Sequence, residues 1–140
     1  MTQKRPHRIA LVAHDGAKTA MLALVERHEE VLRHSRLVAT ATTGGLLNEH
    51  FDLRVHCLKS GPMGGDLQIG ALVAEEQLDL VVFLRDPLTA HPHDPDIQAL
   101  MKVCDVHDTP LATNPATAEL CLGALAEGAP ARPGVGLGAA

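Results

Sequence analysis

Aromatic residues are nearly absent from this chain of 140 residues, which has no Trp, no Tyr and only two Phe. It therefore offers no platform on which nucleic-acid bases could stack. A basic cluster is missing as well, since 12 Lys and Arg face 17 Asp and Glu, for a net charge of -5. Binding to a phosphate backbone needs clustered cations. We therefore expect no nucleic-acid partner.

Long apolar runs are also lacking. No stretch approaches the ~20 apolar residues of a membrane span, so we expect no membrane partner. The three cysteines, Cys57, Cys104 and Cys121, are odd in number and widely spaced. This pattern is typical of reduced, small apolar residues in a cytoplasmic protein, and it is unlike a disulfide framework.

What the chain does have is a repeated alternation of short apolar runs with segments of helical periodicity. The apolar runs, which predict strands, span residues 8–13, 37–41, 54–58, 79–84 and 110–113. The periodic segments, which predict helices, span residues 17–34, 46–50, 67–77, 95–107 and 115–125. The alternation predicts an α/β fold, a single-domain three-layer αβα sandwich with a mostly parallel five-stranded sheet. We expect the domain at residues 8–125, between a flexible N-terminus (1–7) and a disordered Gly/Ala/Pro-rich tail (126–140).

Polar clusters follow the predicted strands. They lie at residues 14–15, 42–44, 60–66, 86–96 and 113–114. Ligands of parallel sheets bind beyond the carboxyl ends of the strands. We therefore expect these clusters, which are scattered in the sequence, to converge on one site.

The segment Ser60-Gly61-Pro62-Met63-Gly64-Gly65-Asp66 surrounds one carboxylate with glycines. Glycine lets the backbone approach a ligand closely. The Ser60 hydroxyl and free backbone amides suit a phosphate, and Asp66 is placed to act as a base on the same molecule. A strand-to-helix turn without chemistry is the alternative. The convergence of the other clusters favours the functional interpretation.

A second candidate phosphate site is formed by Thr40, Thr42, Thr43 and Gly44, where three hydroxyls precede a helix. The alternative is that Thr40 is an ordinary strand residue and Thr43 a helix cap. Lys18, in the first turn of the first helix, could supply one cation, or it could be a solvated helix residue. Neither a G-x-G-x-x-G motif nor a P-loop is present, which argues against a dinucleotide or ATP.

The segment 91–96 (HPHDPD) packs two imidazoles and two carboxylates into six residues. It allows three interpretations: a metal site formed by His14, His91, His93 and a carboxylate, a structural loop with Asp caps, or a catalytic site. No established metal-ligand spacing is matched, so we expect no metal.

Four carboxylates would surround the same pocket. They are Asp15, Asp66, Asp86 and Asp96. Burial and mutual repulsion raise a carboxyl pKa, whereas a helix N-terminus lowers it, so the net shift is open at this stage. A carboxylate base beside a neutral histidine is the combination needed to remove a proton next to a carbonyl.

The motifs ALVAHD, T-x-TTG, SGPMGGD, DP-L-x-A-x-PHDPD and ATN-x-ATA, in this order and at these spacings, closely resemble the methylglyoxal synthase family over roughly residues 8–122. The resemblance implies a cytoplasmic homohexamer without metal or organic cofactor. It implies a carbon–oxygen lyase that converts dihydroxyacetone phosphate to methylglyoxal and inorganic phosphate, in the methylglyoxal bypass of glycolysis. Phosphate is then both a product and an expected inhibitor.

The same resemblance implies a role for each matching residue. Asp66 would be the catalytic base, and His93 would polarise the carbonyl and contact the substrate. Supporting carboxylates would be Asp15, Asp86 and Asp96. Phosphate and substrate contacts would be Lys18, Thr40, Thr42, Thr43, Ser60 and Gly61, with His14 beside them.

Two other hypotheses remain. A regulatory module that binds a phosphorylated effector would need the Thr and Ser cradle but no base, so the joint presence of Asp66 and the PHDPD segment favours an enzyme. A metal-dependent enzyme would use His91 and His93 as ligands.

Overall fold

A computed structural model describes residues 5–128 of the chain. It has one five-stranded sheet, and every pairing in it is parallel. The strands are β1 (Arg8–Ala13), β2 (Arg36–Ala39), β3 (Val55–Cys57), β4 (Leu80–Leu84) and β5 (Leu111–Ala112). The expected three-layer α/β fold is confirmed. The predicted flexible N-terminus and tail lie largely outside the described residues.

The strand order, β3-β2-β1-β4-β5, places the first strand in the middle of the sheet. Strands β2 and β3 are added in turn on one side of β1. The chain then crosses back, and β4 and β5 are added in turn on the other side of β1. The order therefore reverses between β1 and β4. In parallel sheets a crevice opens at such a reversal, outside the carboxyl ends of the two strands.

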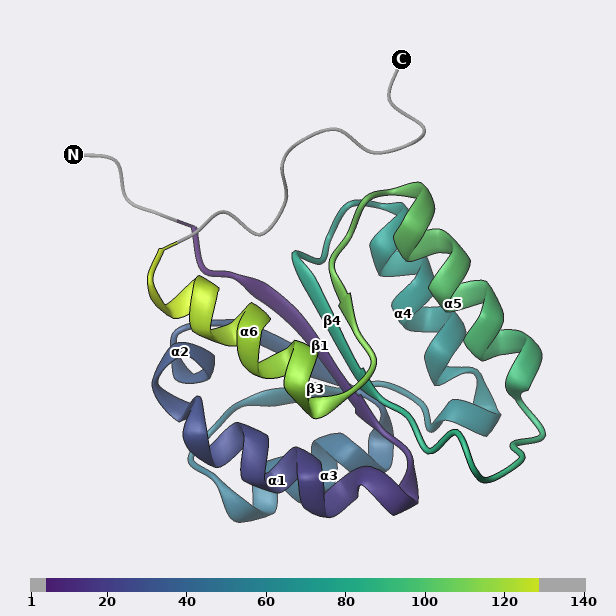
Figure 1. Cartoon of the computed structure of the whole chain (residues 1–140), viewed down its shortest axis with the longest axis horizontal. Coiled ribbons are helices and arrows are strands. Elements are labelled where there is room, and N and C mark those ends of the chain that lie inside the picture. The colour runs from purple at the N-terminus through teal and green to yellow at the C-terminus, as the bar shows by residue number, and fades with distance from the viewer. Residues whose placement is uncertain (1–4, 129–140) are drawn as a thin grey trace.

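The helices cover both faces of the sheet. They are α1 (Lys18–Arg27), α2 (Glu29–Arg33), α3 (Ala41–His50), α4 (Gly65–Ala74), α5 (Asp94–Val106) and α6 (Pro115–Ala126), with short 3-10 turns η1 (Asp15–Ala17) and η2 (Gly61–Met63). Figure 1 shows α4 and α5 side by side on one face, and α1, α3 and α6 on the other. Right-handed crossovers require this distribution. Because the direction in which strands are added to the sheet reverses after β3, the helices that connect the later strands lie on the opposite face. None of the helices within residues 5–128 has the length and apolar character needed to cross a membrane.

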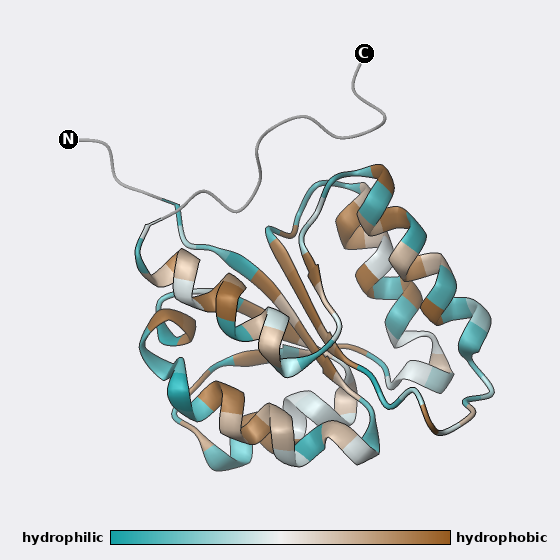
Figure 2. Cartoon of the chain, in the orientation of Figure 1, coloured by the Kyte–Doolittle hydropathy of each residue, from teal (hydrophilic) through white to brown (hydrophobic). Residues whose placement is uncertain are grey.

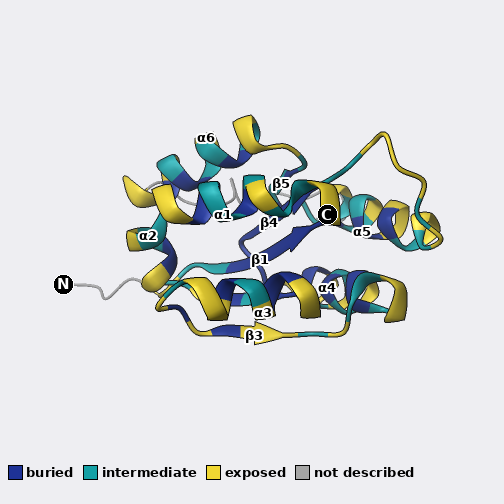
Figure 3. Ribbon diagram, turned by 90° about the horizontal axis from the view of Figure 1, so that it is seen from below, coloured by how far each residue is buried: buried dark blue, intermediate teal, exposed yellow. Residues whose placement is uncertain are grey.

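The core consists of two apolar layers, one on each side of the sheet. Ile9 and Leu11 of β1 pack with α1 and α6, whereas Ala10 and Val12 pack with α4 and α5. Strands buried on both faces read as continuous apolar runs. The hydropathy of β1 and β4 in Figure 2 and their burial in Figure 3 show this directly.

Three helices differ from the sequence prediction, among them α4, which was expected over 67–77 and spans Gly65–Ala74. The segment expected as one helix over 17–34 is interrupted at His28, which ends α1 and precedes α2. A helix was expected only from residue 46, but α3 already begins at Ala41, with Thr40 as its N-cap. Gly44 is needed there because a Cβ would lie 2.5 Å from the Cys57 sulfur. The helix therefore tolerates a poor helix former in exchange for close packing on β3.

The helix caps also differ in part. In the HPHDPD segment, for which Asp caps were one interpretation, Asp94 is the first helical residue of α5, and His93 occupies the N-cap position. At α6 the expected start is confirmed, since the Asn114 side chain accepts a hydrogen bond from the Thr117 backbone N–H at 2.9 Å.

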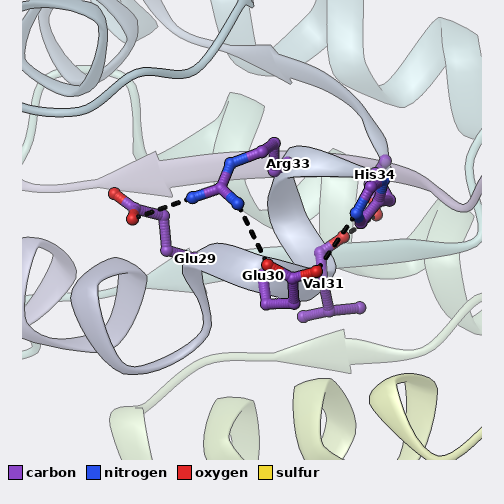
Figure 4. Close-up of polar contacts among 6 residues, drawn as sticks. Glu29, Glu30, Val31, Arg33 and His34 are labelled. Carbon is purple, nitrogen blue, oxygen red and sulfur yellow. Dashed lines mark hydrogen bonds and ion pairs between the residues drawn. The ribbon is translucent and has the colours of Figure 1, made fainter.

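The surface of α2 carries a small ionic network. Arg33 contacts Glu29 at 3.2 Å and Glu30 at 3.0 Å, and Glu30 also contacts His34 (Figure 4). These side chains are largely exposed, and such pairs contribute at most ~1 kcal/mol each.

A buried carboxylate, Asp79, joins β1 to the start of β4 at the edge of the sheet opposite the crevice. Its oxygens accept hydrogen bonds from the Arg8 backbone N–H at 2.9 Å and from the Arg8 guanidinium at 3.2 and 3.3 Å. Burial alone would raise the pKa of Asp79, but the hydrogen bonds and charge of Arg8 outweigh burial and hold it below the ordinary value. The pair therefore stabilises the fold only while Asp79 is ionised.

We expect Asp79→Asn to lower the free energy of unfolding at pH 7 by about 1.5–3 kcal/mol, the range for hydrogen bonds to charged groups. Because the folded pKa is depressed, this contribution is complete above the unfolded pKa of about 3.9 and disappears as pH falls through the folded pKa. Urea unfolding of both proteins at pH 7 and pH 3 measures it, with Asp105→Asn as an exposed control. A difference that stays constant down to pH 3 would contradict the ionic role.

Candidate functional site

A cavity of about 390 Å³ lies at the crevice between β1 and β4. It is built from the segments that follow β1, β2, β3 and β4, as four of the five polar clusters predicted. The fifth cluster, residues 113–114, does not line the cavity, and Asn114 caps α6 instead. All predicted site residues except Thr43 and Asp96 line it. The predicted residues in its wall are His14, Asp15, Lys18, Thr40, Thr42, Ser60, Gly61, Asp66, Asp86 and His93.

One wall of the cavity is the N-terminus of α3. Thr40, almost fully buried, is the N-cap, and Thr42 lies in the first helical turn. The first N–H groups of a helix have no partner within the helix, and the helix dipole adds a partial positive charge. Ser60 and Gly61 face this wall from the end of β3. The arrangement suits a phosphoryl group without requiring a cluster of cations.

Lys18 supplies a positive charge next to this wall. Its Nζ donates to the Ala13 carbonyl at 2.5 Å and to the Thr43 hydroxyl at 3.4 Å, and it lies 3.6 Å from the Asp15 carboxylate. Burial lowers the pKa of Lys18, and Asp15 partly offsets that shift. Thr43 is fully buried, and the Ala13 backbone N–H donates to its hydroxyl at 3.2 Å. Thr43 therefore lies behind the cavity wall and holds Lys18 in place.

Asp66 lies in the first turn of α4 and is fully buried. Its Oδ2 is 3.5 Å from the Nε2 of His93. Within residues 5–128 neither of its oxygens has a hydrogen-bond partner. Burial raises the pKa of Asp66, His93 partly opposes this shift, and Asp96 adds to it. The site therefore holds a carboxylate that is a stronger base than an exposed one, with its oxygens unoccupied.

Gly61 permits the approach of these groups. A Cβ on this residue would lie 2.8 Å from His93 Nε2 and 3.4 Å from Asp66 Oδ1. Any larger side chain would displace one of them. The glycine is thus a spacing requirement of the site.

His14 follows β1 and is nearly buried. The Asp86 backbone N–H donates to its Nδ1 at 2.9 Å, so the proton of the neutral ring lies on Nε2. Burial, and after it the charges of His91, His93 and Arg85, lower the pKa of His14 to about 4, although Asp86 acts in the opposite direction. At neutral pH His14 is therefore an uncharged hydrogen-bond donor.

The three supporting carboxylates have different surroundings. Asp86 accepts hydrogen bonds from the Leu88 backbone N–H at 3.1 Å and from the Thr89 hydroxyl at 2.7 Å, and these bonds lower its pKa. It thereby shapes its own loop. The Asp15 side chain is 99% exposed at the cavity rim. Asp96 stands in the first turn of α5, outside the wall, and acts on Asp66 only through its charge.

His91 is a wall residue that the sequence singled out only as a possible metal ligand. It lines the cavity, and its ring stacks on that of His14 with 3.8 Å between centroids. In the sequence, the only indication that His91 lines the site was its position in the HPHDPD segment. No group of three or more His, Cys, Asp or Glu side chains within residues 5–128 is arranged to hold a metal ion.

Comparisons with known proteins identify the family of the chain. The family model described as MGS-like domain matches residues 20–113. Methylglyoxal synthase of Burkholderia cenocepacia (strain HI2424) is 57% identical over 119 residues, which cover 85% of this chain and 92% of the relative. That of Moorella thermoacetica is 56% identical over 115 residues, covering 82% and 90%. The crystal structure of methylglyoxal synthase from Elizabethkingia anophelis NUHP1 is similar with a TM-score of 0.78 and 43% identity, over 84% of this chain and 77% of that one.

Proposed function

The chain belongs to the methylglyoxal synthase family and is a lyase, and we propose that it converts dihydroxyacetone phosphate to methylglyoxal and inorganic phosphate. One observation carries the mechanism. A buried carboxylate, Asp66, whose oxygens have no hydrogen-bond partner among residues 5–128, lies 3.5 Å from His93 in the same cavity as a phosphate cradle. We place this catalytic unit at residues 8–125.

The phosphoryl group of the substrate would occupy the cradle. Its partners are the start of α3 and the end of β3, namely Thr40, Thr42, Ser60 and Gly61, with Lys18 as the cation. Thr43 contributes from behind the wall by holding Lys18. Fixing this group places the three-carbon end of the substrate at Asp66 and the histidines.

The first chemical step is proton abstraction. Asp66 takes a proton from the hydroxymethyl carbon, and the electron pair moves onto the carbonyl oxygen to form an enediolate. The raised pKa of Asp66 strengthens it as a base. His93 polarises the carbonyl, and the Nε2–H of neutral His14 adds a donor to the substrate. Asp15, Asp86 and Asp96 act as supporting carboxylates around these groups. Donors aimed at developing oxyanion charge can supply several kcal/mol.

The second step is elimination of phosphate. The C–C double bond of the enediolate shifts toward the phosphate-bearing carbon as the C–O bond to phosphate breaks. At the same time the terminal hydroxyl becomes the aldehyde carbonyl and its proton passes to the enolate oxygen, and the resulting enol tautomerises to methylglyoxal. This requires the breaking bond to lie out of the enediolate plane, where it overlaps the π system. Held in the plane, the same intermediate would be reprotonated to an isomer. The cradle is thus a specificity device as well as a binding site.

Assembly, location and cofactors are further parts of the proposal. We infer a homohexamer in the cytoplasm, acting in the methylglyoxal bypass of glycolysis without metal or organic cofactor, and inhibited by its product phosphate. Four large apolar side chains within residues 5–128, Met63, Leu67, Leu88 and Leu120, are 72%, 50%, 95% and 77% exposed, and subunit contacts would cover such residues. Sedimentation of the purified protein measures the oligomeric state.

The test of function is incubation of the purified enzyme with dihydroxyacetone phosphate, with both products assayed. We expect methylglyoxal and free phosphate to appear together, and an added strong chelator to change neither. Formation of neither product would favour the regulatory phosphate-binding module. Activity lost with the chelator and restored by a divalent metal would favour the metal enzyme.

A further inference from the structure

His91 lies in the loop between β4 and α5 and lines the cavity, but it has no role in the proposed proton abstraction or phosphate elimination. We propose that His91 is a positioning residue that acts through His14, holding that ring so that its Nε2–H is available to the bound substrate. The substrate contact of His14 rests on the proposed function, whereas the hold on its ring does not.

The geometry of His14 supports this role. The Asp86 backbone N–H donates to Nδ1 at 2.9 Å, and within residues 5–128 this is the only hydrogen bond to the ring. His91 covers one face of the ring, with 3.8 Å between centroids and 26° between planes. Phe83 meets the ring edge-on, at 5.1 Å and 79°. Together the three contacts hold the His14 ring at Nδ1, at one face and at an edge, and two of them, Asp86 and His91, come from the loop between β4 and α5.

Charge adds a second effect. The groups that face His14 are His91, His93, Arg85 and Asp86, and only Asp86 favours its protonation. After burial, the charge of His91 is the largest cause that lowers the pKa of His14. A protonated Nδ1 would meet the Asp86 N–H donor with a second donor, and the hydrogen bond that orients the ring would be lost. By disfavouring that state, His91 protects the orientation of His14.

The test follows His14 directly by NMR titration of histidine-labelled protein, for the wild type, His91→Phe and His91→Ala. In the wild type we expect His14 to remain a single Nε2–H tautomer, neutral down to about pH 4. In His91→Ala we expect its pKa to rise toward the ordinary 6.5 and the tautomers to mix. In His91→Phe, which keeps an aromatic face but no charge, we expect a higher pKa with the tautomer retained.

Turnover gives a second readout. Loss of an aromatic contact of this kind corresponds to about a 2- to 12-fold fall, and we expect this fall in kcat/KM for His91→Ala at pH 8, with a larger fall at pH 6. His91→Phe should lose less at pH 8. An exposed histidine on β3, His56, provides the control as His56→Ala.

The outcomes separate the two proposals. An unchanged titration and tautomer of His14 in folded His91→Ala or His91→Phe would overturn the positioning role, whatever the activity. The expected titration in a protein that makes no methylglyoxal would support the hold on His14 and overturn the proposed reaction.

Discussion

Asp66→Asn is expected to lower kcat about 10²–10⁴-fold, the contribution of a positioned general base. The amide has nearly the shape of the carboxylate but cannot take a proton. Because Asp66 is not part of the phosphate cradle, inhibition by inorganic phosphate should remain within about threefold of the wild type, since no phosphate hydrogen bond is removed. Steady-state turnover and phosphate inhibition measure the two effects separately.

The pH profile of the wild type supports the same assignment. Burial raises the pKa of Asp66, so the acid limb of kcat/KM should lie above the ordinary carboxyl range, and activity should fall as pH drops through that pKa. Asp105→Asn, an exposed change on α5, is the matched control and should keep wild-type turnover. Near-normal activity of Asp66→Asn would remove this residue as the base.

Gly61→Ala is expected to lower kcat/KM by about 10²-fold, the cost of a misplacement of roughly 1 Å among reacting groups. The added Cβ would lie 2.8 Å from His93 Nε2, which is closer than nonbonded carbon and nitrogen atoms approach. His93 or the loop must therefore move away from Asp66. The loss should appear mainly in kcat, because the groups that move are those at the reacting carbons.

Gly45→Ala is the control for this change. A Cβ on Gly45 meets nothing within 4 Å, and the residue lies in α3, where alanine is favoured over glycine by roughly 0.5–1 kcal/mol. We expect a slightly higher unfolding midpoint and unchanged turnover. Equal activities of the two alanine variants would show that the spacing at Gly61 is not critical.

Much of the fold follows from local sequence. Residues 9–13 and 80–84 are apolar at every position, because β1 and β4 are buried on both faces, and both strands were predicted. The start of α3 was not, because Gly44 resembles a turn residue. Gly44 allows α3 to pack closely against Cys57 on β3. A contact between segments that are distant in sequence leaves no local sequence pattern.

The candidate site was predictable to a similar extent. Parallel strands bring their carboxyl ends to one edge, so the convergence of Ser60, Asp66 and His93 follows from the order of elements. The direction in which each side chain points does not follow from the order of elements. Thr43 points behind the wall and His91 stacks on His14, and both facts depend on packing in three dimensions.

The most direct test of the proposed reaction is a time course of dihydroxyacetone phosphate with the enzyme, followed by ¹H and ³¹P NMR in one sample. We expect methylglyoxal and inorganic phosphate to accumulate in equal amounts as the substrate disappears, without glyceraldehyde 3-phosphate. Formation of glyceraldehyde 3-phosphate in place of free phosphate, or an unchanged substrate spectrum, would contradict it.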